Sequence, residues 1–288
     1  MPYTDLQLAT AFIQAGELDD ALEALDRHLS GHATDEDARR MRARVRARVA
    51  GQQAGALADF DALPAHTPED TILQSSLLLD VGRPDDALAV VADAHRHYPT
   101  HARLTERYVG LLRDANQLEK ARAIVSTQPA DDWRWRSRAG DLAVAAGDEA
   151  AALEQYAAAI TLLDDRYNLS ALTGAATLND ASFAQMDNIS EAAALTVEVE
   201  YARLLLARAG VNLRLGNMDA AEADYVQAAV ILPDDVTILF FRGLIAHQRG
   251  DDATARRLCN DGLAGVRPAV REQLLAAAPA AIQALIED

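Results

Sequence analysis

Turn-forming and small residues recur along the chain at regular intervals, each followed by a stretch of mixed apolar and acidic residues. The stretch "GELDDALEALDRHL", which starts at Gly16, has counterparts in "GDEAAALEQYAAAI" from Gly147 and "GNMDAAEADYVQAA" from Gly216. Seven turn residues align in this way, at Gly16, Gly51, Gly82, Asn116, Gly147, Gly216 and Gly250, separated by 35, 31, 34, 31, 69 and 34 residues. An alanine stands five residues after each of them, at Ala21, Ala56, Ala87, Ala121, Ala152, Ala221 and Ala255, and a larger residue four further on, at Leu25, Phe60, Val91, Val125, Tyr156, Tyr225 and Cys259. The chain therefore repeats one unit seven times.

The spacing within the unit predicts a pair of helices. The alanine and the larger residue four positions later share one face of a helix, which begins shortly after the turn residue. Glycine at the turn suits the left-handed backbone that often ends a helix, so a first helix should stop there. Acidic residues that follow the turn can cap the second helix and face its positive end; they are Asp19, Asp20, Asp85, Asp86, Asp251 and Asp252. Proline follows several second helices, at Pro68, Pro99, Pro233 and Pro268, where it ends them. Each unit is thus a helical hairpin, and the fold class is all-α.

This pattern resembles the tetratricopeptide repeat family, whose unit of about 34 residues has a small-residue position in its first helix, an alanine and an aromatic position in its second, and a final proline. The resemblance covers about residues 3–165 and 200–268. The small-residue position reads Ala9, Arg44, Ser75, Val109, Gly140, Ala209 and Gly243, and Arg44 and Val109 depart from it. The family's tryptophan near the start of the unit is missing throughout. The resemblance implies an α-solenoid of antiparallel helical hairpins that coil into a right-handed superhelix.

We expect residues 1–288 to form a single solenoid. Residues 3–165 hold repeats one to five, and residues 191–266 hold repeats six and seven, with a first helix of repeat six that is extended backwards. Residues 166–190 are rich in Asn, Ser, Thr and Asp and are either an inserted loop or a degenerate repeat, of which the insertion is favoured. Residues 268–288 carry apolar residues at helical spacing and are expected to form a capping helix over the last repeat.

Composition and charge narrow the classes of partner. The formal net charge of -17 repels polyanions, which argues against general binding of nucleic acid or anionic membranes. No stretch approaches the ~20 apolar residues of a membrane-spanning helix, and no signal peptide is visible, so a cytoplasmic location is the expectation. The single cysteine, Cys259, cannot form an intramolecular disulfide.

Motifs of catalysis are not found in the sequence, and we expect no enzymatic activity, cofactor or metal. There is no glycine-rich phosphate loop and no pair of histidines with an intervening glutamate. His95, His97 and His101 are the one cluster that could suggest zinc, but their place around Pro99 favours a solvated turn. Cys259 falls in the apolar column of the repeat and is interpreted as a core residue.

Candidate binding residues lie on the first helices, which line the concave face in a superhelix of this kind. A partner-binding groove is predicted from Arg103, Glu106, Arg107, Arg113, Arg134, Arg138, Asp141 and Arg203. These arginines could form a basic groove that takes carboxylates bidentately. Alternatively, they pair with Glu106, Asp141 and neighbouring acids on a solvated face.

Other residues near the groove have two interpretations as well. An aromatic beside a groove can anchor a ligand, but Trp135 is assigned to packing, which leaves Trp133 as the candidate anchor. The arginines between 39 and 48 surround their helix, and most are expected to be solvated or paired with acidic turns. Some family members bind a chain-terminal carboxylate with a clamp of two lysines, two asparagines and one arginine. The asparagine positions here read Thr10, Val45, Ser76, Gly110, Asp141, Gly210 and Leu244, so that function does not carry over.

The function predicted from the sequence is a non-catalytic scaffold or adaptor that binds a protein or peptide segment, including one with acidic residues, in its groove. One alternative is a structural subunit of a larger assembly or a homo-oligomer. The other is a regulatory sensor domain.

Overall fold

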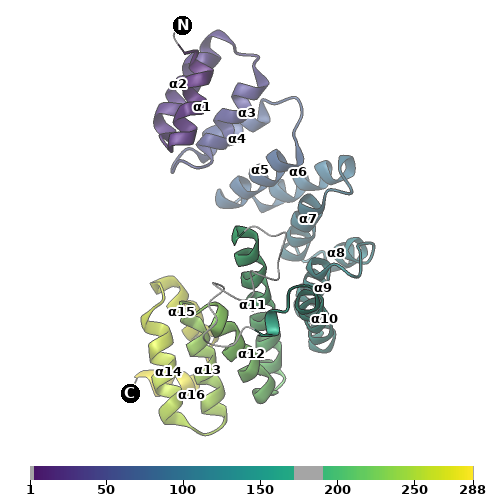
Figure 1. Cartoon of the computed structure of the whole chain (residues 1–288), viewed down its shortest axis with the longest axis vertical. Helices are drawn as coiled ribbons and strands as arrows, with labels where there is room; N and C mark the ends of the chain where they lie inside the picture. Colours follow the sequence, from purple (N-terminus) through teal and green to yellow (C-terminus); the bar gives the residue numbers. More distant parts are fainter. Residues whose placement is uncertain (1–2, 172–190, 288) are drawn as a thin grey trace. The chain divides into compact units, whose positions relative to one another are not determined.

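The computed structural model describes residues 3–171 and 191–287, and over these residues it contains helices and no strand (Figure 1). The helices are α1 (Asp5–Ala15), α2 (Leu18–Gly31), α3 (Glu36–Arg46), α4 (Gln53–Asp61), α5 (Pro68–Asp80), α6 (Pro84–His97), α7 (Ala102–Asp114), α8 (Leu118–Val125), α9 (Trp133–Ala145), α10 (Glu149–Tyr167), α11 (Glu191–Arg214), α12 (Met218–Ile231), α13 (Thr237–Gln248), α14 (Asp252–Ala264), α15 (Pro268–Ala277) and α16 (Ala280–Glu287), with a short 3-10 helix, η1, at Leu169–Ala171. The predicted all-α class is confirmed.

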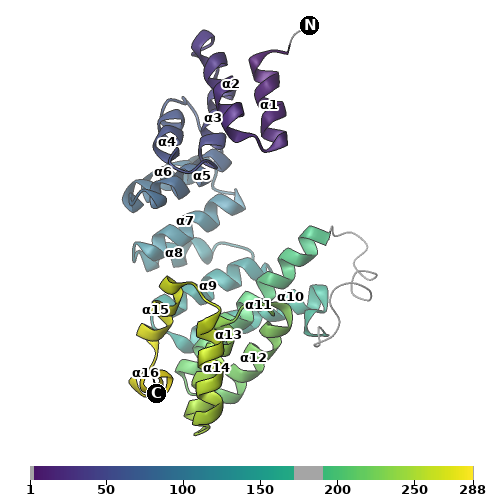
Figure 2. The same cartoon turned by 90° about the vertical axis from the view of Figure 1, so that its left-hand side faces the viewer.

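The helices pair as antiparallel hairpins within two compact units (Figure 2). Unit 1, Met1–Ser126, holds the hairpins α1–α2, α3–α4, α5–α6 and α7–α8. Unit 2, Thr127–Asp288, holds α9–α10, α11–α12 and α13–α14, followed by α15 and α16. Each repeat recognised in the sequence therefore corresponds to one hairpin.

The seven aligned turn residues all have the left-handed backbone that the sequence predicts. Their φ angles are positive, from 55° at Asn116 to 81° at Gly250, and in the described chain Asn168 is the one further residue with positive φ. Gly16 shows the mechanism: its N–H donates to the carbonyls of Ile13 and Phe12, which ends α1. Asparagine tolerates this conformation better than most residues, which explains Asn116 among the glycines.

The alanines that follow the turns form the seam inside each hairpin. All seven have no exposed surface, and the larger residues four positions on are buried too, apart from Val125, which is partly buried. In two hairpins the facing residue of the first helix is a glycine with no room for a side chain. A Cβ added at Gly140 would lie 2.6 Å from Cε1 of Tyr156, and one at Gly243 would lie 2.4 Å from Sγ of Cys259. The seam thus pairs a small residue on one helix with a larger one on the other.

The departure at Arg44 has a simple cause. Arg44 is exposed, and its neighbour Ala43 is fully buried in the core with Ala56 and Phe60. Helix α3 ends at Arg46, and the turn before Gly51 is longer than in the other hairpins. The small residue of the second repeat is therefore Ala43, one position earlier than the alignment from the glycine places it.

The acidic residues after the turns cap fewer helices than the sequence suggests. Asp251 accepts a hydrogen bond from the N–H of Thr254 at the start of α14. Helices α2 and α6 have no side-chain cap, and their aspartates, Asp19, Asp20, Asp85 and Asp86, lie inside the first turn. There they stabilise the helix through its dipole rather than through a cap.

Two segments depart from the regular hairpins, one after α10 and one at the start of α11. Helix α10 ends at Tyr167, and Asn168 and η1 follow. The choice between an inserted loop and a degenerate repeat for residues 166–190 falls mainly on residues 172–190, which lie outside the described residues. Helix α11 begins at Glu191 and is 24 residues long, so it extends well before the part that pairs with α12.

The C-terminal segment forms two helices where one capping helix was expected. Pro279 disfavours helical backbone at Ala278, whose φ and ψ are -76° and 144°, so α15 stops there. Helix α16 then packs against α14 and places Ile282, with no exposed surface, in a core with Phe240 and Leu263. Helix α16 therefore covers the last hairpin, α13–α14.

Candidate functional site

The eight residues predicted to line a groove all lie on first helices, and none of them is buried. Arg103, Glu106, Arg107 and Arg113 lie on α7 in unit 1; Arg134, Arg138 and Asp141 lie on α9 and Arg203 on α11, in unit 2. The prediction placed them on one surface. The structure divides them between the two units, four in each.

In unit 2, Arg134 is held by the residue that caps its helix. Asp132 accepts a hydrogen bond from the N–H of Arg134 at the start of α9. The same carboxylate receives the guanidinium, with Nη2 2.6 Å from Oδ2 and Nε 3.0 Å from Oδ1. This hydrogen bond from Arg134 lowers the pKa of Asp132. Arg134 is therefore locally compensated at the start of α9.

The other arginines of unit 2 also lie beside carboxylates. Nη1 of Arg138 is 3.2 Å from Oδ2 of Asp141, whose Oδ1 accepts a hydrogen bond of 2.8 Å from the hydroxyl of Tyr156. Arg203 donates to Glu200 over 2.7 Å at a largely exposed position. Within unit 2, this geometry matches the alternative in which arginines pair with nearby acids.

In unit 1, two arginines of α7 are near acidic residues. Nε and Nη2 of Arg113 lie 3.0 and 2.8 Å from Oδ1 of Asp114. Arg103 is exposed, and its charge helps to lower the pKa of Glu69, after a backbone hydrogen bond and the contact with His101. Both arginines therefore lie near a carboxylate, Asp114 for Arg113 and Glu69 for Arg103.

Arg107 differs from the rest of the set because its partners are neutral. Its Nε donates to Oγ of Ser75 over 2.9 Å, and its Nη2 donates to Oγ of Ser76 over 3.2 Å. Both serine hydroxyls donate in turn to the carbonyl of Ile72, over 2.8 and 3.1 Å. Burial lowers the pKa of Arg107, which is partly enclosed between α5 and α7. No carboxylate of the described residues lies within ion-pair distance of it.

A family model described as Tetratricopeptide repeat matches residues 78–142, and these residues include the hairpin α7–α8 that carries Arg107. Residues 78–142 of this chain are thus similar to the tetratricopeptide repeat family. Solved structures agree on the fold. A tetratricopeptide repeat protein from Parabacteroides merdae has a TM-score of 0.68 and 14% identity, over 94% of this chain and 96% of that chain.

Two further structures share the fold at similarly low identity. The Cut9–Hcn1 hetero-tetramer of the APC/C gives a TM-score of 0.57 and 13% identity, over 95% of this chain and 55% of that chain. PilW, a type IV pilus biogenesis factor, gives a TM-score of 0.52 and 16% identity, over 80% of this chain and 92% of that chain. No curated protein matches the sequence significantly.

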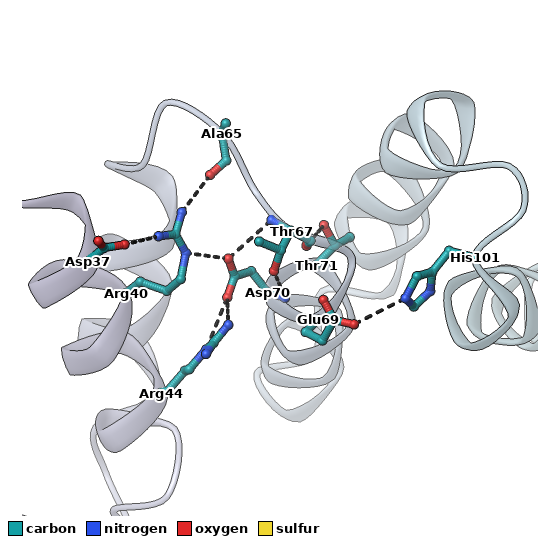
Figure 3. Close-up of polar contacts among 9 residues, drawn as sticks. All are labelled: Asp37, Arg40, Arg44, Ala65, Thr67, Glu69, Asp70, Thr71 and His101. Atoms are coloured by element: carbon teal, nitrogen blue, oxygen red, sulfur yellow. Dashed lines mark hydrogen bonds and ion pairs between the residues drawn. The ribbon is translucent and has the colours of Figure 1, made fainter. Parts of the chain in front are cut away.

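The arginines of α3 have a role that the sequence did not predict. Figure 3 shows Arg40 and Arg44 pointing from α3 to Asp70 on α5, a residue with no exposed surface. Nε of Arg40 lies 2.7 Å from Oδ2 and Nη2 of Arg44 lies 2.7 Å from Oδ1. Asp70 also accepts from the N–H of Thr67 in the capping box of α5. Burial alone would raise the pKa of Asp70, but the hydrogen bonds from Arg44, Arg40 and Thr67 outweigh it and lower the pKa.

A second buried carboxylate, Asp59, contacts α3 on another face of that helix. Asp59 of α4 receives Nε of Arg42 at 2.9 Å and Nη1 of Arg46 at 2.9 Å, and both arginines also reach Asp26 of α2. Residues four apart share a helix face, so 40 with 44 and 42 with 46 form two pairs. That spacing was the signal available in the sequence. These four arginines form ion pairs that connect α3 to α2, α4 and α5. They are therefore not simply solvated or paired with acidic turns, as most of them were expected to be.

The three histidines around Pro99, for which the sequence favoured a solvated turn over a zinc site, have separate partners. The His95 ring lies 5.1 Å from that of Tyr108, Nδ1 of His97 contacts the carbonyl of Asp93 at 3.0 Å, and His101 caps α7 through the N–H of Leu104. Across residues 3–171 and 191–287, no group of three histidine, cysteine or carboxylate side chains is placed to hold a metal ion.

The remaining candidates are packing residues. Cys259 is fully buried, and burial raises its pKa to about 11, so it is a core residue with little thiolate. Trp135 is buried at 4% exposure, and Trp133 packs, partly exposed, against the core of unit 2. None of the helices in the described part of the chain has both the length and the hydropathy needed to cross a bilayer.

Proposed function

We propose that this protein is a non-catalytic protein–protein interaction scaffold that binds a segment of a partner on its first helices. The observation that carries the proposal is the accessibility of one face of these helices after the hairpin seam is buried. The eight residues predicted from the sequence all retain exposed surface, from Arg103 on α7 to Arg203 on α11. Within each unit, stacked repeats can present such first-helix surfaces for binding.

The ion pairs on this surface are compatible with partner binding. An exposed pair contributes about 0–1 kcal/mol, because water screens both charges and ordering two long side chains costs entropy. Arg138 and Asp141, with side chains 39% and 23% exposed, form such a pair. A carboxylate of a partner can therefore replace the local one at little cost, and the arginines would orient an acidic segment.

Charge reversal tests the proposal. The double variant Arg107→Glu and Arg138→Glu should capture less of its partners from an extract of the native organism, measured by quantitative mass spectrometry of the co-purified proteins. The matched control is Arg96→Glu with Arg256→Glu, which changes the net charge equally at exposed positions of the second helices α6 and α14. Equal capture by the two double variants would reject this face as the binding surface, provided that circular dichroism shows both to be folded.

A structural role in an assembly or homo-oligomer has one observation in its favour. Val226 and Val230 lie one turn apart on α12 with 44% and 36% of their surface exposed. Apolar residues adjacent on a helix face are typical of contacts between chains. Light scattering of the full chain would show a concentration-dependent mass that Val226→Asp with Val230→Asp reduces; a constant monomer mass would exclude self-association.

A further inference from the structure

A pocket of about 620 Å³ lies in unit 1, and none of the eight predicted groove residues lines it. Its walls are the connection between α4 and α5, residues 63–66, and the last turns of α6, between residues 89 and 98, together with Thr71 of α5. Both walls contribute apolar side chains, such as Leu63 and Val90. A volume of this size with an apolar wall and a few polar groups is typical of sites for small molecules.

The connection between α4 and α5 is fixed by contacts of its own. Nη2 of Arg40 lies 3.3 Å from the carbonyl oxygen of Ala65, as Figure 3 shows. Nε2 of His66 lies 2.9 Å from the carbonyl oxygen of Phe60, and Leu63 is buried in the same core as Phe60. These contacts hold the wall of the pocket in place, so a ligand need not order the chain in order to bind.

The polar side chains of the pocket donate their protons to backbone carbonyls. A carbonyl oxygen only accepts, so Nε2 of His66 carries the proton in its contact, and Nδ1 of the neutral ring has a lone pair. In the same way, Nδ1 of His97 donates to the carbonyl of Asp93 over 3.0 Å, which leaves a lone pair on Nε2. Oγ1 of Thr71 donates to the carbonyl of Thr67 over 3.2 Å and can then only accept.

The pocket is therefore rich in hydrogen-bond acceptors and poor in donors. Asp93 adds an exposed carboxylate, and its ion-pair partner, Arg96, does not line the pocket. No lysine or arginine is among the described residues that line it. The Tyr98 hydroxyl can donate or accept, and the Tyr98 ring can contact a cation. An anion would meet no positive charge in this pocket, whereas a cation with several N–H groups would find several acceptors.

We propose that this pocket binds a small apolar amine, with its ammonium group at the acceptors of His66, His97 and Asp93 and its apolar part against Leu63 and Val90. An ammonium group has three N–H donors and no acceptor, which matches this set of side chains. The net charge of -17 also favours a cation over an anion. Because no groove residue takes part, this site would exist whether or not the first helices bind a partner.

Three ligands of similar shape test this site with the full chain: tryptamine, tryptophol and indole-3-propionate. They share an indole ring, and their side chains end in an ammonium, a hydroxyl and a carboxylate group. Saturation of the amide shifts in a nitrogen-15 spectrum gives the affinity, and the residues that shift locate the ligand. We expect tryptamine to shift residues 63–66 and 89–98 and to bind most tightly, tryptophol to bind more weakly, and indole-3-propionate to cause no shift.

Variants locate the ligand and separate the contact from general charge effects. Ala89→Phe, at an exposed position of α6, places a ring in the pocket and should abolish the shifts that tryptamine causes. Asp93→Asn should weaken tryptamine binding about threefold, the effect of one exposed charge, and should leave tryptophol binding unchanged. The matched control is Asp86→Asn, which removes the same charge from an exposed position of α6 outside the pocket and should have no effect.

Several results would overturn the assignment of this pocket. They are equal affinity for the three ligands, tightest binding of indole-3-propionate, no shift with tryptamine up to its solubility limit, and full binding of tryptamine by Ala89→Phe. Equal weakening by Asp93→Asn and Asp86→Asn would also overturn it, because the effect would then come from net charge. None of these results bears on partner capture through Arg107 and Arg138, which the charge-reversal variants test separately.

Discussion

Replacing Glu198 by glutamine should remove a pH dependence from the stability of unit 2. Glu198 lies in α11 with 6% of its surface exposed, and it forms no hydrogen bond or ion pair with another residue of the described chain. Burial disfavours the charged form and raises the pKa of Glu198 from its ordinary 4.5 to about 7. The carboxyl group should therefore be half-protonated near neutral pH in the folded protein.

The sign and size of the effect follow from linkage. Between about pH 4.5 and 7 the folded state keeps a proton on Glu198 that the unfolded state has released, so the free energy of unfolding falls as pH rises through this window. Each unit of pKa shift corresponds to about 1.4 kcal/mol, which gives a loss of about 3 kcal/mol by pH 8. Glutamine resembles the protonated acid and does not ionise. The variant and the natural protein should be equally stable near pH 4.5, and the variant should be more stable by about 3 kcal/mol at pH 8.

Fluorescence makes the measurement specific to unit 2. The chain has two tryptophans, Trp133 and Trp135, and both lie on α9 in that unit. Urea unfolding followed by tryptophan emission from pH 4.5 to 8.5 gives the stability at each pH. Glu154→Gln, at an exposed position of α10, is the control for removing one negative charge.

The reasoning would be refuted by two results. If Glu198→Gln and Glu154→Gln change stability by the same amount at every pH, burial of Glu198 has no special effect. If the gain from Glu198→Gln is already complete at pH 5, it arises from packing and not from ionisation.

Two other predictions concern packing and buried charge. Asp70→Asn should destabilise unit 1 by about 3 kcal/mol, since it leaves two arginines facing a neutral group; hydrogen exchange of α3 and α5 measures this, and Asp37→Asn, at an exposed position, should change it little. The lowered pKa of Asp70 also means that this stabilisation is lost as pH falls below the ordinary range of an aspartate. Gly140→Ala should destabilise unit 2 in tryptophan-detected unfolding, because the added Cβ meets the Tyr156 ring at 2.6 Å. Gly210→Ala, where no atom lies within 4 Å, should instead stabilise unit 2 by about 0.5–1 kcal/mol, and the opposite order of the two variants would contradict the seam.

Local signals made the repeat readable. A residue that must take positive φ is nearly restricted to glycine and asparagine. The seven turns could therefore be recognised from the residue types at these positions. The alanine column was equally visible, because two helices can approach closely only where a side chain is small. The one misplacement, Arg44 for Ala43, arose from a single extra residue in a turn, which an alignment from the glycine cannot detect.

Long-range charge pairing was the part that could not be predicted. The sequence shows arginines around α3, but whether they face water or a carboxylate depends on where α4 and α5 place Asp59 and Asp70. The same holds for the predicted groove. Sequence spacing predicted the same role for Arg107 and Arg138, as arginines that line a groove. In the structure, Arg107 donates to two serine hydroxyls, whereas Arg138 lies beside a carboxylate.

The amino-acid sequence alone determined the all-α class, the seven hairpins and the residues of their seams, since each depends on backbone conformation or side-chain size within one unit. Tertiary structure decided which charges are compensated. The energy of a charged side chain is set by the atoms within a few ångströms of it, and these come from neighbouring helices whose approach the repeat pattern does not encode. Arg107 is distinctive for that reason, because the helix beside it presents hydroxyl groups where α3 meets carboxylates.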